Sequence, residues 1–228
     1  MSSDLAIFGG KPIREKSFPS WPKVTDEIKQ GLIDTLENDE WGIGSGTIDR
    51  FNSKFSKEHE AKYCLALHSG TSAIWVSLKA IGVQAGDEVI IPSYTFIATA
   101  SAVILANAIP VFADINIENG NIDPSSIESL ITKKTKAIIP VHTGGSPADM
   151  GSILNISKKY NIPVIEDAAQ AHGAVWHGNK VGALGMGGIF SFQTSKNMSS
   201  GEGGAIISND ESFMDACYSY HNCGRVTD

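Results

Sequence analysis

Between residues 63 and 166, short and continuous apolar runs alternate with segments of helical periodicity. Continuous apolar runs are typical of strands that are covered on both faces. Repeated strand–helix units connect parallel strands and place helices on both sides of the sheet. The sequence therefore predicts an α/β fold with three layers, α/β/α, around a mostly parallel central sheet. The predicted strands are residues 63–67, 88–91, 109–113, 137–141 and 163–166, and the predicted helices between and around them are 47–59, 71–81, 97–105, 124–131, 149–160 and 210–221.

The segment before this alternation is predicted to be different. Residues 1–24 contain Gly and Pro at positions that interrupt regular structure, so an irregular arm is expected. Its aromatic residues Phe18 and Trp21 are expected to pack onto the body. Thr25 is expected to cap a helix with apolar residues at helical spacing. We therefore divide the chain into an N-terminal arm, 1–24, and one large domain, 25–228.

Composition limits the possible classes of function. The net charge is −7, and no run of Lys or Arg is present, which argues against a nucleic-acid partner or an anionic membrane surface. The N-terminus lacks a basic region followed by a long apolar core, and no apolar stretch is long enough to cross a bilayer. The three cysteines have no zinc-type spacing, so we expect no metal site and predict a cytoplasmic location.

One lysine, Lys196, lies between an apolar run that begins at Gly187 and a second run at 205–208. Burial disfavours the charged form of an amine, and a desolvated amine is a better nucleophile. Lysines of this kind form Schiff bases with carbonyl cofactors such as pyridoxal phosphate (PLP). The alternative is an ordinary surface lysine at a hairpin turn. The residues at the other strand ends distinguish this alternative from a cofactor-binding lysine.

In open α/β sheets, ligands bind beyond the carboxyl ends of the strands. Residues Gly70–Ala73 follow the first predicted strand and open a helix, where free backbone N–H groups and the helix dipole suit a phosphate. An ordinary helix cap by Ser69 or Thr71 is the alternative. After the second strand, an aromatic residue of the segment 92–96 could lie flat on a ring-shaped cofactor or simply belong to the core.

Two later strands end in titratable residues. His142 follows one of them and could contact a ligand or have a structural role. Glu166 and Asp167 lie at the end of the other, where a buried carboxylate is costly unless it is paired. A protonated pyridine nitrogen would be a suitable partner. A structural Arg or Lys is an alternative, and so is a metal ion, although no companion cluster of acids or histidines is evident.

Four segments of the chain occur in the order typical of one known family: Gly70–Ala73, Pro92–Ala100, Glu166–Gly173 and Ser191–Gly204. Each motif alone is weak evidence for a family, but the four motifs in this order are specific for one. Together they resemble the DegT/DnrJ/EryC1/StrS family of PLP-dependent sugar aminotransferases, whose large domain has the fold-type I architecture of aspartate aminotransferase. The resemblance covers about residues 5–225.

The resemblance implies roles for seven residues. Lys196 would carry the Schiff base with PLP, and Asp167 would pair with the pyridine nitrogen. Gln170 would lie near the phenolic oxygen of the cofactor, and Phe96 would stack on its ring. Some relatives have histidine in place of the lysine and are dehydratases, which Lys196 argues against. The phosphate would be held without a basic cluster, by Thr71, Ser72 and Ser191.

The resemblance further implies amino transfer from glutamate or glutamine to a keto sugar, expected to be nucleotide-linked, with cyclitol ketones left open. Members of the family continue into a smaller C-terminal domain, which we expect to be missing from a chain of 228 residues. A truncated, non-catalytic protein that keeps the PLP pocket and has a binding or regulatory role is therefore the alternative. A nicotinamide-dependent enzyme is disfavoured because no glycine fingerprint follows a predicted strand.

The family shares each active site between two subunits, which implies a homodimer. Phe18, Trp21 and the loop Trp41–Gly46 would otherwise expose apolar surface of the kind that marks an interface. They could instead complete the core of the monomer. Because twofold symmetry is the commonest arrangement of such proteins, we predict a homodimer, with a small-molecule keto sugar and an amino-acid donor as its other partners.

Overall fold

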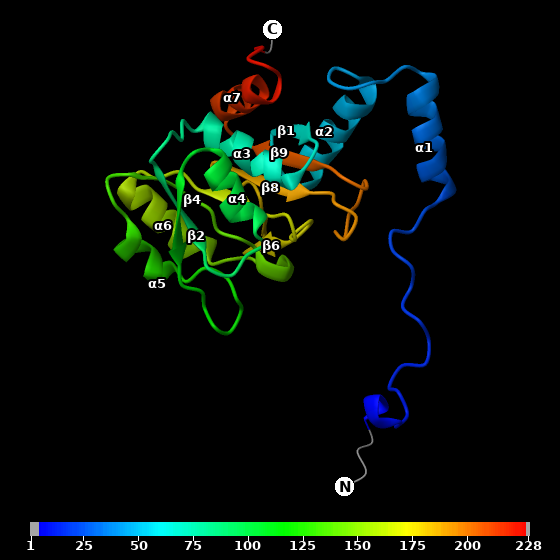
Figure 1. Cartoon of the computed structure of the whole chain (residues 1–228). Helices are drawn as coiled ribbons and strands as arrows, with labels where there is room; N and C mark the ends of the chain where they lie inside the picture. The colour runs from blue at the N-terminus through cyan, green and yellow to red at the C-terminus, as the bar shows by residue number, and fades with distance from the viewer. Residues whose placement is uncertain (1–4, 227–228) are drawn as a thin grey trace.

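A computed structural model describes residues 5–226 of the chain. Its central sheet is continuous and mostly parallel (Figure 1). The ladder β1–β9–β8–β5 is joined to the ladder β4–β2–β3 by parallel bridges from Ile138 to Val164 and from Val141 to Asp167. β9 runs opposite to β8 and β1, and the other pairings are parallel. The strands are β1 (Tyr63–Leu67), β2 (Glu88–Pro92), β3 (Ile109–Ala113), β4 (Thr135–Ile138), β5 (Ile165–Asp167), β8 (Gly187–Ser191) and β9 (Gly204–Ser208), with a small separate hairpin of β6 (Val175–Trp176) and β7 (Asn179–Lys180).

Helices cover both faces of the sheet, which confirms the predicted three-layer fold class. Alternate strand residues such as Ile91 and Ile165 join the core under α3 (Gly70–Ala80), α4 (Ala98–Leu105) and α7 (Glu211–His221). Their neighbours, such as Ile90 and Val164, join the core under α5 (Pro124–Ile127) and α6 (Met150–Tyr160), and α2 (Gly46–Glu58) covers Phe190 on the same side. None of the helices in the described range has the length and apolar content needed to cross a bilayer.

Polar side chains begin several helices, as the sequence predicts. The Thr25 hydroxyl accepts a hydrogen bond from the backbone N–H of Ile28 and starts α1 (Asp26–Glu37). The Asp149 carboxylate accepts from the N–H of Ser152 and starts α6. These caps satisfy backbone donors that have no partner inside the helix.

Most predicted elements match the observed ones to within one or two residues at each end, and two differ more. The predicted strand 137–141 is observed as β4, Thr135–Ile138. Pro140 has no N–H to donate to a ladder, so regular pairing stops before it. The predicted helix 124–131 is a single α-helical turn, α5, followed by the 3₁₀ helix η2 (Glu128–Leu130).

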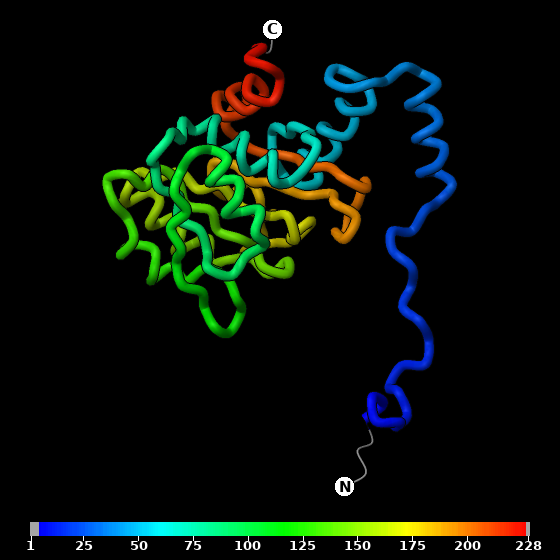
Figure 2. Tube along the Cα trace, in the orientation of Figure 1, coloured from blue at the N-terminus to red at the C-terminus, as the bar shows by residue number. Residues whose placement is uncertain are grey.

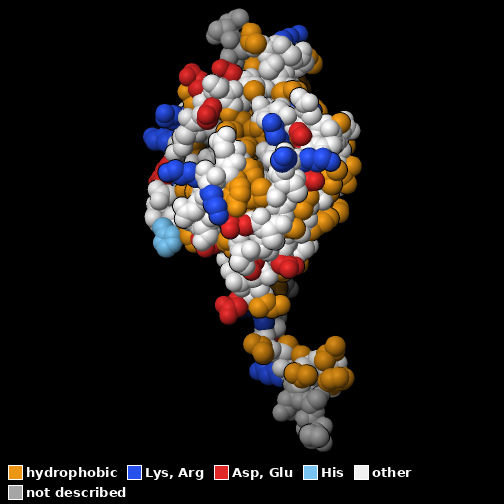
Figure 3. All heavy atoms as spheres, turned by 90° about the vertical axis from the view of Figure 1, so that its left-hand side faces the viewer, with side chains coloured by type: hydrophobic (Ala, Val, Ile, Leu, Met, Phe, Trp, Pro, Cys, Tyr) orange, Lys and Arg blue, Asp and Glu red, His pale blue; other side chains and the backbone are white. Residues whose placement is uncertain are grey.

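The N-terminal segment stands away from the sheet (Figures 1 and 2). Residues 5–24 contain one short 3₁₀ helix, η1 (Ala6–Phe8), and α1 has no buried residue. Contrary to expectation, Phe18 does not pack onto the body, since it is 79% exposed and lies under the Arg14 guanidinium. Apolar side chains gather at the far end of the arm (Figure 3). The apolar residues of α1, all of them exposed, are Ile28, Leu32, Ile33 and Leu36.

Candidate active site

A cavity of about 490 Å³ opens at the carboxyl ends of the parallel strands. Ser69 follows β1, Phe96 follows β2, and Val141 follows β4, while Asp167 and Ser191 end β5 and β8. The predicted position of a ligand site, beyond the strand ends, is therefore where the structure has its cavity. Six of the seven residues predicted for the site line it: Thr71, Phe96, Asp167, Gln170, Ser191 and Lys196.

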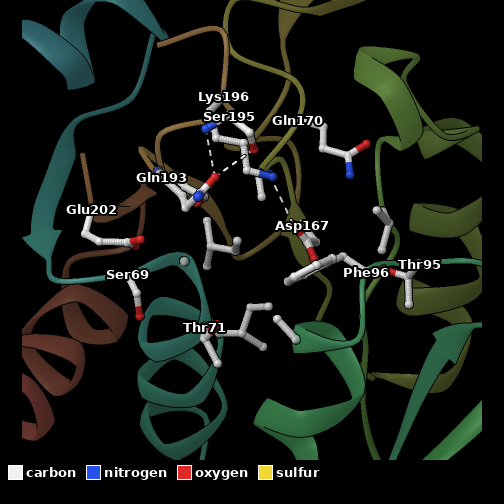
Figure 4. Close-up of a pocket in the computed structure, with 17 residues that line it drawn as sticks. Ser69, Thr71, Thr95, Phe96, Asp167, Gln170, Gln193, Ser195, Lys196 and Glu202 are labelled. Carbon is white, nitrogen blue, oxygen red and sulfur yellow. Dashed lines mark hydrogen bonds between the residues drawn. The ribbon is translucent and has the colours of Figure 1, made fainter. Parts of the chain in front are cut away.

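Lys196 lies on the loop between β8 and β9 and is half-buried. Its Nζ is 5.9 Å from the centroid of the Phe96 ring on the opposite wall. The backbone of the loop is held by Gln193, whose carbonyl accepts from the N–H of Lys196 at 2.8 Å. The Gln193 side chain also accepts from the N–H and the hydroxyl of Ser195, at 2.8 and 2.7 Å (Figure 4). The loop thus has a defined turn that supports the lysine.

Asp167 lies at the inner end of the cavity and is buried. Burial raises the pKa of this carboxyl, whereas hydrogen bonds from Thr99 and Ala169 lower it. The Thr99 hydroxyl donates to Oδ2 at 2.8 Å, and the Ala169 N–H donates to Oδ1 at 3.1 Å. The hydroxyls of Thr95 and Thr99 lie 2.8 Å apart, which extends the network to the cavity wall. Two donors therefore offset part of the cost of a buried charge.

The neighbouring acid, Glu166, faces the other side of the sheet because successive strand residues point to opposite faces. Its carboxylate accepts from the N–H groups of Gly182, Leu184 and Gly185 at 2.7–2.9 Å. It also lies 3.0 Å from Nε2 of His142, and both side chains are fully buried.

His142 accepts at Nδ1 from the N–H of Ala148, at 3.1 Å, so that Nε2 carries the proton and donates to Glu166. Both ring nitrogens are used inside the protein. The sequence left open whether His142 contacts a ligand or has a structural role, and these bonds indicate a structural role.

Gln170 follows Asp167 in the chain, and its exposed side chain is one of those that line the cavity (Figure 4). Its side-chain oxygen accepts from the N–H of Gly144 at 2.7 Å. That bond leaves the amide NH₂ group as the hydrogen-bonding end of the side chain that remains for a ligand.

The N-terminus of α3 meets the end of β8 at the cavity. A Cβ atom on Gly70 would lie 2.9 Å from Cβ of Ser191, and one on Gly204 would lie 2.3 Å from the carbonyl oxygen of Ser69. Glycine at both positions therefore permits the close approach that brings Thr71 and Ser191 to one wall.

Ser72 is the one predicted site residue that does not line the cavity. Its hydroxyl donates to the carbonyl of Ser69 at 2.8 Å, and its N–H donates to the Ser69 hydroxyl at 3.1 Å. Ser69 therefore caps α3, as one sequence interpretation held, and it also lines the cavity.

Among the residues that line this cavity, Lys196 is the single cation. Within residues 5–226, no group of three or more His, Cys, Asp and Glu side chains is arranged to hold a metal ion. The chemistry available is therefore that of one amine, two carboxylates (Asp167 and Glu202) and several hydroxyl and amide groups.

A match to the DegT/DnrJ/EryC1/StrS aminotransferase family covers residues 22–228. The chain belongs to this family. It is 42% identical over 215 residues to the L-glutamine:2-deoxy-scyllo-inosose aminotransferase of Streptomyces kanamyceticus, which aligns with 92% of this chain and 50% of that protein. The family resemblance inferred from the four sequence motifs is confirmed.

Solved structures of aminotransferases have the same fold. The aminotransferase from Psychrobacter cryohalolentis has a TM-score of 0.89 and 39% identity, over 92% of this chain and 54% of that one. A Bacillus subtilis protein with bound cofactor PMP has a TM-score of 0.81 and 33% identity, over 92% of this chain and 49% of that one. The chain thus spans about half the length of the relatives it matches.

Some polar residues in or next to the cavity were given no role in the sequence analysis. Thr99 belongs to one of the family motifs, but its bond to Asp167 joins positions 68 residues apart and has no local signal. Gln193 and Ser195 lie beside the lysine, where a turn is predictable but the direction of each side chain is not. The other residues missed are Thr95 and Glu202.

Proposed function

We propose that this chain is the cofactor-binding part of a PLP-dependent aminotransferase. The observation that carries the proposal is the arrangement of three groups in one cavity. The Nζ of Lys196 lies 5.9 Å from the centroid of the Phe96 ring, and the buried carboxylate of Asp167 lies at the inner end between them. A nucleophilic amine, a flat ring and a carboxylate are the groups that a pyridoxal cofactor requires.

The cavity suits this cofactor in its donor chemistry. Thr71, Ser191 and the first turn of α3 offer hydroxyl and N–H donors for a phosphate, without an arginine. Gly70 lets the first turn of α3 pack closely against Ser191, because a Cβ at position 70 would lie 2.9 Å from Cβ of Ser191. Ser72 can contribute its hydroxyl only if the bond to the Ser69 carbonyl is released.

In this proposal each remaining residue has one task. Phe96 stacks on the ring, Asp167 pairs with the ring nitrogen, and the Gln170 amide donates to the phenolic oxygen. The bound cofactor supplies a conjugated cation that accepts electrons from the bond at the reacting carbon. Lys196 supplies the amine that first holds the cofactor. In the first half of the reaction, its Nζ would take the proton from Cα of the amino donor. In the second half, it would return a proton to the acceptor carbon that receives the amino group.

For the substrates, we propose L-glutamine as the donor and a polyhydroxylated cyclic ketone as the acceptor. The support is the named activity of the relative from Streptomyces kanamyceticus, which uses L-glutamine and a deoxy-inosose. The nucleotide-linked keto sugar expected from the sequence is the second acceptor class. Glutamate is the second donor.

We also propose a homodimer that works in the cytoplasm. The exposed apolar face of α1, with Trp41 nearby in the chain, provides surface of the kind that marks an interface. Cys64, Cys217 and Cys223 are free thiols, which fits a reducing compartment.

The test adds PLP to the purified protein and records the visible absorption band of the lysine-bound cofactor. We expect the band in the wild type and in Lys136→Ala, which removes an exposed lysine, and its loss in Lys196→Ala. An identical band in Lys196→Ala would show that the wrong lysine has been assigned.

A second step adds glutamine or glutamate to the loaded protein, followed by a keto-inositol or a nucleotide-linked keto sugar. Loss of the visible band with glutamine, and its recovery with the cyclic ketone, supports amino transfer. A stable band with every donor would favour the non-catalytic alternative. Recovery with the nucleotide-linked sugar alone would replace the acceptor proposed above.

A further inference from the structure

Trp21, in the N-terminal arm, contacts the loop that carries Lys196. Its indole Nε1 donates to the carbonyl of Thr194 at 3.2 Å and to the carbonyl of Lys196 at 3.1 Å. The contact joins segments 173 and 175 residues apart in the sequence. One N–H shared between two carbonyls is a three-centre hydrogen bond.

The two carbonyls belong to the residues on either side of Ser195, in the turn whose N–H groups Gln193 binds. Within residues 5–226, no group other than Trp21 donates to either of them. Gln193 accordingly fixes the N–H groups of Ser195 and Lys196, while Trp21 fixes the carbonyls. The backbone of the lysine is therefore held from both sides.

We infer that Trp21 is a positioning residue for Lys196, an inference that builds on the function proposed above. The lysine side chain has four methylene groups, so the direction of its Nζ toward Phe96 depends on where its backbone is held. A backbone that can rotate about the turn spreads the amine over more positions and lowers the fraction that points into the cavity. The arm thereby takes part in the site without lining it.

Trp21 is 55% exposed, so its indole ring is only partly covered. The contact with the loop that the structure defines is the hydrogen bond donated by its N–H group. Trp21→Phe keeps an aromatic ring and removes that donor. Tyr220→Phe is the control, since it also removes a polar donor from an exposed aromatic residue, which is 48% exposed and lies in α7, outside the lysine loop.

The first experiment measures amide hydrogen exchange in the protein without cofactor, by mass spectrometry of peptides covering residues 193–203. We expect Trp21→Phe to speed exchange of this segment roughly two- to tenfold, the range that corresponds to loss of one net hydrogen bond. Tyr220→Phe should leave the exchange rate of this segment unchanged. Equal exchange in Trp21→Phe and the wild type would overturn the inference, as would equal acceleration by both variants.

The second experiment traps the cofactor on the protein by adding PLP and borohydride, followed by quantification of labelled Lys196. Trp21→Phe should need about two- to tenfold more PLP for half-maximal labelling, in proportion to its exchange rate. Faster exchange with unchanged labelling would also overturn the positioning role. Absence of labelling in the wild type would refute the proposed function instead, which is a separate outcome from the exchange result.

Discussion

Leu78 in α3 and Leu32 in α1 both lie on apolar helix faces, but their environments are opposite. Leu78 is fully buried against the sheet, whereas Leu32 is 65% exposed. An apolar stripe at helical spacing indicates that a helix will be covered, but it does not specify what covers it. The body, from α2 to α7 (residues 46–221), supplies its own cover, and the N-terminal segment up to the end of α1 does not.

The largest expected effect tests the polar interior of the body. Glu166→Ala leaves His142 and the N–H groups of residues 182, 184 and 185 without their acceptor. We expect the free energy of unfolding to fall by about 3–5 kcal/mol, because several buried donors lose their acceptor and each unsatisfied donor costs about 1–3 kcal/mol. Denaturant titration measures this change. Glu118→Ala, at an exposed position, is the control, and a similar loss in both variants would contradict the assignment.

The next effect tests the apolar core. Leu78→Ala removes a fully buried side chain and should lower the free energy of unfolding by about 2–5 kcal/mol. The same denaturant titration applies. A loss below about 1 kcal/mol would mean that α3 is less tightly covered than the structure shows.

A third effect tests the polar wall where α3 meets β8. Ser191→Ala removes one hydroxyl from the wall proposed to hold the phosphate. Cofactor binding should weaken by about 1–3 kcal/mol, since hydrogen bonds to charged groups lie in that range. A fluorescence titration with PLP measures the affinity, with the exposed Ser129→Ala as control. Unchanged affinity would remove Ser191 from the phosphate site.

The fourth effect depends on pH and again separates the two regions, because residues 1–58 contain no histidine. Burial lowers the pKa of His172 from 6.5 to about 4. The unfolded chain therefore binds this proton more readily, so the contribution of neutral His172 is present above pH 6.5 and is lost as the pH falls toward 4. Melting temperatures from pH 7.5 to 4 should decline less in His172→Asn than in the wild type or in the exposed His177→Asn. Parallel curves would contradict this role.

The smallest effect on folding is expected in α1. Leu32→Ala should change the free energy of unfolding by less than about 0.5 kcal/mol, because the side chain has little contact to lose. If α1 forms the dimer interface, the same variant should raise the dissociation constant of the dimer in a sedimentation series. A dimer of unchanged affinity would place the interface elsewhere.

The layered fold could be predicted because each strand is a continuous apolar run and the turns after them contain recognisable caps, such as Asp149. The bounds of an element were harder to predict where a single residue ends its regular pairing, as Pro140 does after β4. The course of the arm could be predicted only in part. Phe18 and Trp21 are both residue types that are common in cores, but Phe18 is exposed, whereas Trp21 contacts the body through its indole N–H.

For the site, the types of the main residues could be predicted from the sequence, but the contacts that hold their side chains or backbone in place could not. Asp167 and Lys196 stand out in the sequence because each is a charged residue beside an apolar strand. The bonds from Thr99 to Asp167 and from Trp21 to the lysine loop connect distant segments, and only the folded chain brings them together. The same applies to the orientation of Glu166, which depends on the register of β5.

That register has a consequence for how this protein can vary in length. Glu166 and Asp167 are adjacent in β5 and serve opposite faces, one in the interior with His142 and the other in the cavity. Inserting or deleting one residue just before them would exchange the two carboxylates and disable both at once. We therefore expect insertions and deletions among relatives to avoid the residues between Pro163 and Asp167, while the loops on either side tolerate them.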